Sequence, residues 1–411
     1  MRLYERKSYP WVVIILLVVV SLLNYLDRQM LATMRPFMMV DIRELESYAN
    51  FGRLMAIFLW IYALLSPISG MVADRLNRKW LIIISLFVWS AVTMGMGHVK
   101  DIHSLYILRA LMGISEAFYI PAALSLAADY HQGPTRSTAI GVLTSGVYLG
   151  QIFGGFGATV AAHSSWQFTF QSFGLIGVLY SLVLIAFLRE KKTYKEEGKL
   201  TFLQELKASG NGLAVLFTNI AFWVMLYYFA ALNLPGWTTK NWLPTLLSES
   251  LGLGMDVAGP IATTSLALSS FVGVFLGGWI SDKWAKRTLK GRIYTSATGL
   301  SMIIPALLLM NFGHGLAATV ISAAVFGIGF GMYDTNNMPI LCQFVSSRYR
   351  ATGYGLMNMV GIASGAVITT ELGKAMEAGH QNLIFGIMVV TVALAVCLQL
   401  TVLRPETLDK Q

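Results

Sequence analysis

Charged residues are scarce in this sequence, and cysteine is almost absent. Lys, Arg, Asp and Glu make up 12% of the 411 residues, against 55% that are hydrophobic, and this charged fraction is about half that of an ordinary soluble domain. The two cysteines, Cys342 and Cys397, both lie in apolar runs, so no disulfide framework is indicated. The sequence has no Walker A loop, no His-Glu-x-x-His motif and no Cys/His cluster with metal-ligand spacing. We therefore expect neither an enzyme nor an ATP-driven pump, and no bound cofactor.

Long apolar runs are what the sequence has instead. About 20 apolar residues suffice to cross a bilayer as a helix, and twelve such runs occur. The first is too long for a signal-peptide core and continues without a convincing cleavage site, so it counts as a helix. The predicted fold is all-α, with twelve transmembrane helices at 11–38, 52–73, 80–98, 104–128, 137–160, 167–188, 212–234, 257–280, 292–312, 316–344, 351–373 and 382–403.

The net charge of +9 reflects how the chain is oriented in the membrane and does not indicate a nucleic-acid partner. Of the 30 Lys and Arg residues, 22 lie in the amino tail, the even-numbered connections and the carboxyl tail. Because basic residues are enriched in cytoplasmic segments, both termini are predicted to be cytoplasmic. We expect no nucleic-acid partner, and expect membrane lipids to surround the helices.

The chain contains an internal repeat. Residues 70–79 and 278–287 share the pattern Gly-x-x-x-Asp followed by basic residues at an offset of 208, and residues 136–141 resemble residues 350–355 at an offset of 214. The polar stretch 189–210 lies between the two copies. Two independent pairs at similar offsets indicate two six-helix halves.

The predicted organisation therefore has three parts. Residues 1–188 form an amino-terminal six-helix bundle, residues 189–210 a cytoplasmic linker, and residues 211–411 a carboxyl-terminal six-helix bundle. Within the linker, residues 199–209 place leucines on one side and polar residues on the other, which predicts a short amphipathic helix at the membrane interface.

Ionisable residues within the apolar runs are functional candidates, because burying a charge in a bilayer is costly. Arg109 and Glu116 are seven residues apart, so they share a helix face about 10 Å apart and cannot pair directly. Asp27 and Arg28 on the first helix supply the complementary charges. The four form a formally neutral cluster that can exchange partners when a proton or an anion arrives, although a permanently paired cluster that only fixes helix packing is the alternative. Asp334 could serve either function or packing.

Hydrogen-bonding side chains at membrane depth are candidates for binding a polyhydroxylated ligand, because each buried polar group needs a partner. A neighbouring helix could satisfy any of them instead. Asn336 and Asn337 lie close to Pro339, which we expect to kink its helix. The candidates are Tyr25, Tyr119, Tyr148, Gln151, Tyr227, Tyr333, Asn336, Asn337 and Asn358.

Residues 70–79 resemble the signature loop of the major facilitator superfamily. The resemblance implies that fold, in which parallel halves place the substrate site near the bilayer midplane between them. It also implies a cytoplasmic gate in which the glycine permits close helix approach and the aspartate pairs with basic residues across the seam. The alternative is that the basic residues only anchor the chain at the membrane surface. The implied gating residues are Gly70, Asp74, Arg75, Arg78 and Asp282.

Two further motifs resemble one branch of the superfamily, the anion:cation symporters, which include sugar-acid carriers and sialin. They are Asn24-Tyr-Leu-Asp-Arg28 and Arg109-x-x-x-Gly-x-x-Glu116-Ala, with support from Trp242-Leu-Pro-Thr after the seventh predicted helix. The resemblance implies that Arg28 binds a substrate carboxylate, that Asp27 and Glu116 carry protons, and that Arg109 tunes them. The substrate would then be a small organic anion with protons as the coupling ion.

Residues 146–155 resemble the antiporter signature of the superfamily, except that Gln151 stands where proline is usual. This difference favours symport. The motifs of the first and fourth helices also resemble spinster-type transporters of lysophospholipids, which stays an open alternative, as does a non-transporting membrane sensor. Short loops and the lack of an Asn-x-Ser/Thr site favour a multi-pass protein of a bacterial inner membrane, functional as a monomer.

Overall fold

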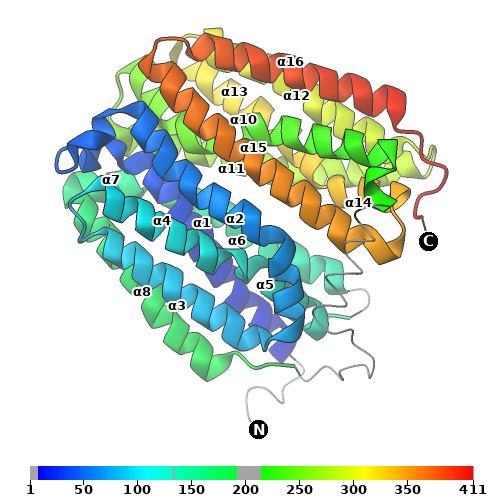
Figure 1. Cartoon of the computed structure of the whole chain (residues 1–411), viewed down its shortest axis with the longest axis horizontal. Helices are drawn as coiled ribbons and strands as arrows, with labels where there is room; N and C mark the ends of the chain where they lie inside the picture. The colour runs from blue at the N-terminus through cyan, green and yellow to red at the C-terminus, as the bar shows by residue number, and fades with distance from the viewer. Residues whose placement is uncertain (1–7, 133–134, 192–212, 214, 411) are drawn as a thin grey trace. The chain divides into compact units, whose positions relative to one another are not determined.

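The computed structural model describes residues 8–132, 135–191, 213 and 215–410. Twelve helical spans in this described part are long and apolar enough to cross a membrane, as the sequence predicts. The chain divides into two compact units, described separately below (Figure 1). Unit 1 comprises Met1–Lys199 and Gly254–Thr263, and unit 2 comprises Leu200–Leu253 and Thr264–Gln411. The predicted amphipathic helix at 199–209 lies outside the described residues.

Unit 1 is built from eight described helices together with the first turns of α11. Helices α1 and α6 pack against one another, as do α3 and α8 and, less extensively, α2 and α4. The helices are α1 (Tyr9–Met38), α2 (Tyr48–Arg75), α3 (Arg78–Met96), α4 (Ile102–Ala117), α5 (Tyr119–Tyr130), α6 (Arg136–Gly155), α7 (Gly157–His163) and α8 (Trp166–Phe187).

The close packing of α1 on α6 depends on glycine. A Cβ atom added at Gly146 would lie 2.5 Å from the Val18 carbonyl oxygen, and one added at Gly150 would lie 2.3 Å from that of Leu22. Since backbone atoms cannot move aside as a flexible side chain can, only glycine permits this approach. The contact holds α1, which carries Asp27 and Arg28, in a fixed position within unit 1.

Unit 2 has a similar set of paired helices. Helix α10 packs on α15, and α12 packs on both α13 and α16. The helices are α10 (Ile220–Leu251), α11 (Met255–Ala285), whose first turns belong to unit 1, α12 (Gly291–Phe312), α13 (Gly315–Asp334), α14 (Asn337–Phe344), α15 (Arg350–Glu377) and α16 (Gln381–Val402).

Two spans are interrupted at corresponding places. Helices α4 and α5 meet at Phe118, and α13 and α14 meet at Thr335 and Asn336. Each break lies just before a proline, Pro121 or Pro339, whose ring clashes with the carbonyl four residues earlier and whose nitrogen donates no hydrogen bond. The kink predicted near Pro339 is therefore present, and it leaves Asp334 at the end of a helix instead of mid-helix.

The predicted end of the seventh helix is wrong. We expected it at residue 234, with Trp242 beyond it, but α10 continues to Leu251. The polar residues that resemble a loop are satisfied by α15: the Trp242 indole donates to the Thr369 carbonyl at 3.1 Å, and Asn241 donates to the Thr369 hydroxyl at 3.0 Å. Lys240 therefore belongs to the interior of a membrane span.

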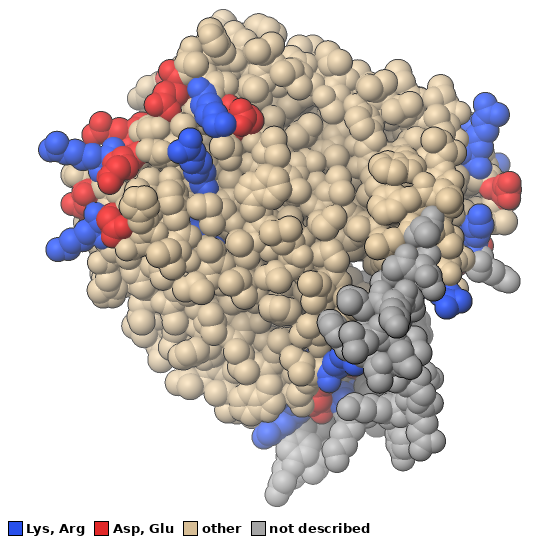
Figure 2. Space-filling view, viewed as in Figure 1, with Lys and Arg blue, Asp and Glu red and all other residues tan. Residues whose placement is uncertain are grey.

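The outer surface of each unit is apolar. Large side chains such as Leu179 and Leu182 in unit 1, or Trp279 and Phe312 in unit 2, are more than half exposed. On the face drawn in Figure 2, the acidic and basic side chains gather at the ends of the helices, and the surface between them carries none. Apolar surface of this extent marks contact with a membrane, so the chain is a multi-pass integral membrane protein.

Candidate functional site

The charge cluster predicted from the sequence lies in unit 1, where α1, α2, α3 and α4 meet. The Arg28 Nε donates to Glu116 Oε2 at 2.5 Å, and the Glu116 side chain is fully buried while that of Arg28 is 10% exposed. This ion pair joins α1 to α4. The prediction that Glu116 finds its partner on the first helix is confirmed.

Aromatic rings surround the Arg28 guanidinium. Its Cζ lies 4.9 Å from the ring centroid of Tyr25, 4.6 Å from that of Phe58 and 5.0 Å from that of Tyr62. A guanidinium over aromatic faces is stabilised by the ring quadrupoles. Phe58 and Tyr62 on α2 were not among the residues singled out from the sequence, because single aromatic residues in apolar helices carry no distinguishing pattern.

Arg109 shares the Phe58 ring with Arg28. Its Cζ lies 4.7 Å from the Phe58 centroid, and its Nη1 donates to the Met112 sulfur at 3.1 Å. Both Arg109 and Glu116 are buried on α4. A single ring thus lies against two guanidinium groups, with Glu116 near both.

Asp27 points to a different neighbour. Consecutive residues of a helix are about 100° apart around its axis, so Asp27 turns away from the Glu116 pair and accepts a hydrogen bond from the Thr93 hydroxyl of α3 at 3.2 Å. Asp27 is 2% exposed, and it forms no ion pair with Arg109 within 4.0 Å. The structure therefore brings the four charges together but makes only one of the two expected pairs.

Several buried polar atoms of this cluster have no hydrogen-bond partner in the described chain. They are both amide atoms of Asn24, Arg28 Nη2, Arg109 Nε and Glu116 Oε1. Asn24 lies one turn before Arg28, on the same face of α1, and is wholly buried. Leaving a buried polar atom unpaired costs about 1–3 kcal/mol, and such atoms are rare in native proteins. The cluster is therefore suited to bind a ligand that can form hydrogen bonds.

The other candidates in unit 1 differ in how far protein groups satisfy their hydrogen-bonding capacity. The Tyr119 hydroxyl lies 2.7 Å from the Ser21 hydroxyl and donates to the Leu17 carbonyl at 3.1 Å, so Tyr119 fastens α5 to α1. Tyr148 and Gln151 are buried on α6, and Tyr25 is half-buried on α1. No hydrogen bond from the Gln151 amide to the described residues is formed, so it stays a binding candidate.

In unit 2, the candidates collect around the break between α13 and α14. Asn336 is satisfied by protein, since it donates to the Met332 carbonyl at 2.8 Å and accepts from the Ser281 hydroxyl at 2.5 Å. Asn337 donates weakly to Asp334 at 3.4 Å, and its carbonyl oxygen and the Tyr333 hydroxyl are buried without partners among the described residues. Asn337 and Tyr333 thus have unused hydrogen-bonding capacity for a ligand, and Asn336, although its amide is paired with protein here, also stays a predicted binding residue.

Lys240 joins this group; it was not a predicted site residue, because it lies beyond the predicted end of the seventh helix at residue 234. Its ammonium lies 4.8 Å from the Phe330 ring centroid and 5.2 Å from that of Trp237, and it interacts electrostatically with Asp334. Tyr227 donates only a long hydrogen bond to the Thr391 carbonyl, at 3.4 Å. Asn358 is half-buried on α15.

The signature-loop residues form a network at one end of unit 1. The Arg78 guanidinium pairs with Asp129 at the end of α5, and the Glu190 carboxylate accepts hydrogen bonds from the backbone N–H groups of Arg78 and Lys79 at 3.3 and 2.7 Å. Within the described residues no atom lies within 4 Å of a Cβ added at Gly70, and its gating role stays a prediction.

The remaining gating candidates are placed only by their helices. Arg75 ends α2 and is half-buried, and Asp282 is exposed in the last turn of α11. The side chain of Asp74 lies outside the described part of the chain. The described residues hold no group of three or more His, Cys, Asp or Glu that could bind a metal ion.

Comparison with known proteins places this arrangement in a family. The sequence profile of the Major Facilitator Superfamily matches residues 17–370, which is most of the chain. This protein belongs to the Major Facilitator Superfamily. It is therefore a membrane transporter, and the family resemblance of residues 70–79 is confirmed.

Relatives within the superfamily include transporters of sugar acids. The chain is 28% identical over 345 residues to the hexuronate transporter of Bacillus subtilis (strain 168), covering 78% of this chain and 76% of the relative. It is 27% identical over 304 residues to the D-galactonate transporter of Escherichia coli O6:H1, covering 67% of each. These matches bear out the resemblance of the first and fourth helices to sugar-acid carriers.

Solved structures show the same fold. A bacterial homologue of the human lysosomal transporter Spinster, in an inward-facing and occupied conformation, superposes with a TM-score of 0.76 at 22% sequence identity, covering 96% of this chain and 97% of the other. At that identity the match establishes the superfamily fold alone.

Proposed function

We propose that this transporter imports an organic anion of the sugar-acid class together with protons, by alternating access. The observation that supports it is the buried Arg28–Glu116 pair at 2.5 Å, in which Arg28 Nη2 still has no partner in the described chain. A guanidinium presents a planar fork that matches a carboxylate. Arg28 is the substrate-binding cation, and Glu116 is the group that the substrate displaces.

Partner exchange couples the anion to a proton. When a substrate carboxylate takes the Arg28 fork, Glu116 loses its counter-charge in a fully buried position. An unpaired buried charge is strongly destabilising, so Glu116 becomes neutral by taking up a proton. Substrate and proton then move together, and when the substrate leaves, the ion pair re-forms and expels the proton.

Asp27 is the second proton-binding group in this proposal. It is buried, accepts a hydrogen bond from Thr93 and has no ion pair to a described cation, so a change of its charge breaks no ion pair. Arg109, on the same helix as Glu116 and packed on Phe58 of α2, provides a fixed positive potential that keeps both acids able to release their protons.

Coupling to protons also offsets the electrical work of importing an anion against the membrane potential. An anion that enters a cell with an inside-negative potential meets about 2.3 kcal/mol per charge per 100 mV. One co-transported proton removes that opposition, and a second makes the potential drive import. We place the protein in a bacterial inner membrane, where both the potential and the proton gradient are available, and expect a monomer to suffice.

The sugar-acid class is favoured by polar side chains within each unit and by the relatives. A sugar acid needs one cation for its carboxylate and several neutral partners for its hydroxyls, and Gln151, Asn337 and Asn358 offer amides for that purpose. One relative is named as a transporter of hexuronate and another as a transporter of D-galactonate.

The test is uptake into proteoliposomes that hold the purified protein. An inward proton gradient should drive accumulation of at least one hexuronate or aldonate, with neutral sugars and lysophospholipids as comparisons. An uncoupler should abolish accumulation while leaving exchange of labelled for unlabelled substrate. Transport of a lysophospholipid but of no carboxylate would refute the proposal.

A further inference from the structure

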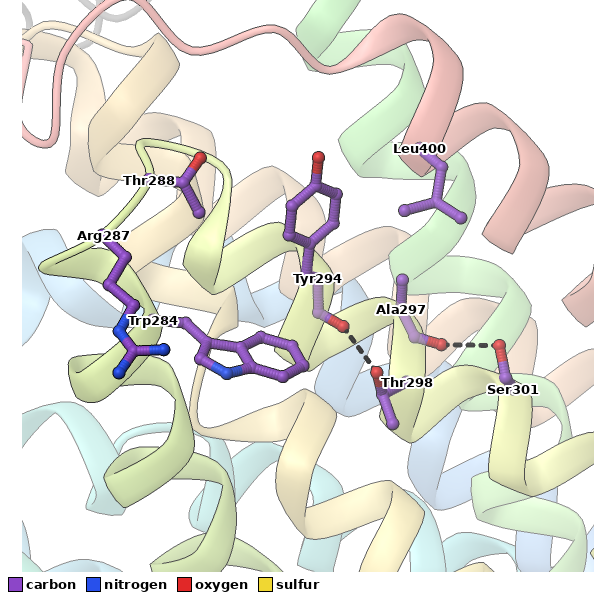
Figure 3. A pocket seen from close by; sticks show the side chains of 8 residues that line it. All are labelled: Trp284, Arg287, Thr288, Tyr294, Ala297, Thr298, Ser301 and Leu400. Carbon is purple, nitrogen blue, oxygen red and sulfur yellow. Dashed lines mark hydrogen bonds between the residues drawn. The ribbon is translucent and has the colours of Figure 1, made fainter.

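A groove of about 600 Å³ opens on unit 2 beside the end of α11 (Figure 3). It is lined by side chains from the end of α11 and the connection that follows, from the first turns of α12, and by Leu400 of α16. It lies far along the chain from the charge cluster of unit 1, and the transport mechanism above makes no use of it.

The inner wall of the groove is effectively apolar. It carries two hydroxyl groups, but Thr298 donates to the Tyr294 carbonyl at 2.8 Å and Ser301 donates to the Ala297 carbonyl at 2.8 Å (Figure 3). Both hydroxyls are thus turned to their own helix, and the wall they form with Ala297 and Leu400 suits a hydrocarbon chain.

The other end of the groove carries free hydrogen-bond donors. The Arg287 guanidinium lies beside the Trp284 indole, whereas the Tyr294 side chain extends away from both, toward the side of Leu400 (Figure 3). In the described chain the Arg287 guanidinium makes no hydrogen bond or ion pair, and neither does the Trp284 indole N–H. A cation and a neutral donor side by side favour an anion.

The surroundings add positive charge and lipid contact. Five basic residues occur between Lys283 and Arg292, next to a single acid, Asp282. Trp279 on α11 and Leu308 on α12 are exposed on the apolar surface. Basic clusters at the end of a membrane span attract anionic lipid headgroups, and aromatic residues such as Trp284 and Tyr294 prefer the headgroup level.

The matching place in unit 1 is closed by the protein itself. The 208-residue offset aligns Lys79 with Arg287, but Lys79 is buried, its ammonium donates to the Ile185 carbonyl at 3.1 Å, and its backbone N–H donates to the Glu190 carboxylate. The tail after α16 carries Glu406 and Asp409, but Asp409 pairs with Arg350, and neither carboxylate forms an ion pair with Arg287 within the described residues. Arg287 therefore lacks the protein contacts that satisfy Lys79.

We propose that this groove binds one anionic phospholipid of the surrounding membrane. Its phosphodiester contacts the Arg287 guanidinium and the Trp284 indole N–H, and one acyl chain lies along Tyr294, Ala297 and Leu400. A zwitterionic lipid is disfavoured because the lining contains no acidic side chain to pair with an ammonium.

The test is native mass spectrometry of the purified protein with phosphatidylglycerol or phosphatidylethanolamine. Arg287→Gln should lower retention of phosphatidylglycerol about fivefold, the factor that corresponds to ~1 kcal/mol for one basic residue at a membrane surface. The matched control Lys286→Gln removes a neighbouring exposed cation outside the lining and should change retention less than twofold. Equal losses in both variants would overturn the proposal in favour of diffuse surface charge.

A second variant tests the acyl wall without changing charge. Thr298→Trp fills the groove from an exposed position, whereas Leu308→Trp adds the same ring to the lipid-facing side of α12 outside it. Only Thr298→Trp should release the lipid. Retention of phosphatidylethanolamine as strong as that of phosphatidylglycerol, or displacement of the lipid by excess inorganic phosphate, would also overturn the proposal.

Discussion

Replacing Glu116 by glutamine is the sharpest perturbation of the proposed coupling. Gln keeps the shape and buried position of the side chain but cannot hold a negative charge or release a proton. Arg28 then loses the carboxylate that its Nε contacts at 2.5 Å and is permanently available to a substrate. We expect proton-driven accumulation to be lost while substrate exchange persists.

The magnitude follows from the contact that is removed. A hydrogen bond to a charged group contributes about 1.5–3 kcal/mol, so a substrate that no longer competes with Glu116 should bind about 10- to 150-fold more tightly. The empty transporter should lose stability in return, because Arg28 keeps a buried charge without its partner; breaking such a pair costs about 3–5 kcal/mol, less here since the guanidinium is 10% exposed.

The assay pairs two measurements on the same proteoliposomes. Accumulation of labelled substrate under an inward proton gradient reports coupling, and exchange at equal pH reports binding and the conformational change alone. The dependence of binding on pH should weaken, and what remains should be lost on combining the change with Asp27→Asn. If Glu116→Gln still accumulates substrate against its gradient, the partner-exchange mechanism is refuted, whatever happens to affinity.

Three further changes test other parts of the structure. Arg28→Lys should weaken substrate binding at least tenfold, measured by displacement of labelled substrate, because an ammonium cannot form the bidentate contact; unchanged affinity would remove Arg28 from the site. Asn24→Leu should leave the unfolding temperature unchanged or higher, since its amide has no partner in the described chain, yet slow transport at least tenfold; the opposite result would make Asn24 structural. Gly150→Ala should destabilise the protein by about 1–3 kcal/mol through its clash with the Leu22 carbonyl, whereas Gly141→Ala, with no atom within 4 Å, should be neutral in the same thermal assay.

Much of the fold could be predicted because membrane helices are long and their composition is nearly uniform. The twelve spans follow from apolar length alone, and the loop motif at residues 70–79, repeated at 278–287, indicated the family. The boundary of α10 could not be predicted in the same way. Its polar residues are satisfied by α15, and a contact between distant segments leaves no trace in a local window of sequence.

The candidate site could likewise be predicted only in part. Arg28 and Glu116 could be paired from charge and helix geometry, because few other ions are available in an apolar interior. The aromatic contacts of Phe58 and Tyr62, the turn of Asp27 toward Thr93 and the position of Lys240 depend on how helices rotate against each other. Single side chains in apolar helices give no periodic signal for that rotation.

The break at Phe118 has a consequence for how events at the two ends of one span communicate. Helix α4 ends one residue after Glu116, and α5 carries Asp129, which holds Arg78 of the signature loop. The backbone ladder is interrupted before Pro121, and a break of this kind allows two helices to change their angle more easily than one continuous helix. Under the proposed coupling, a change of charge at Glu116 acts directly beside this break, and α5 connects the break to Arg78.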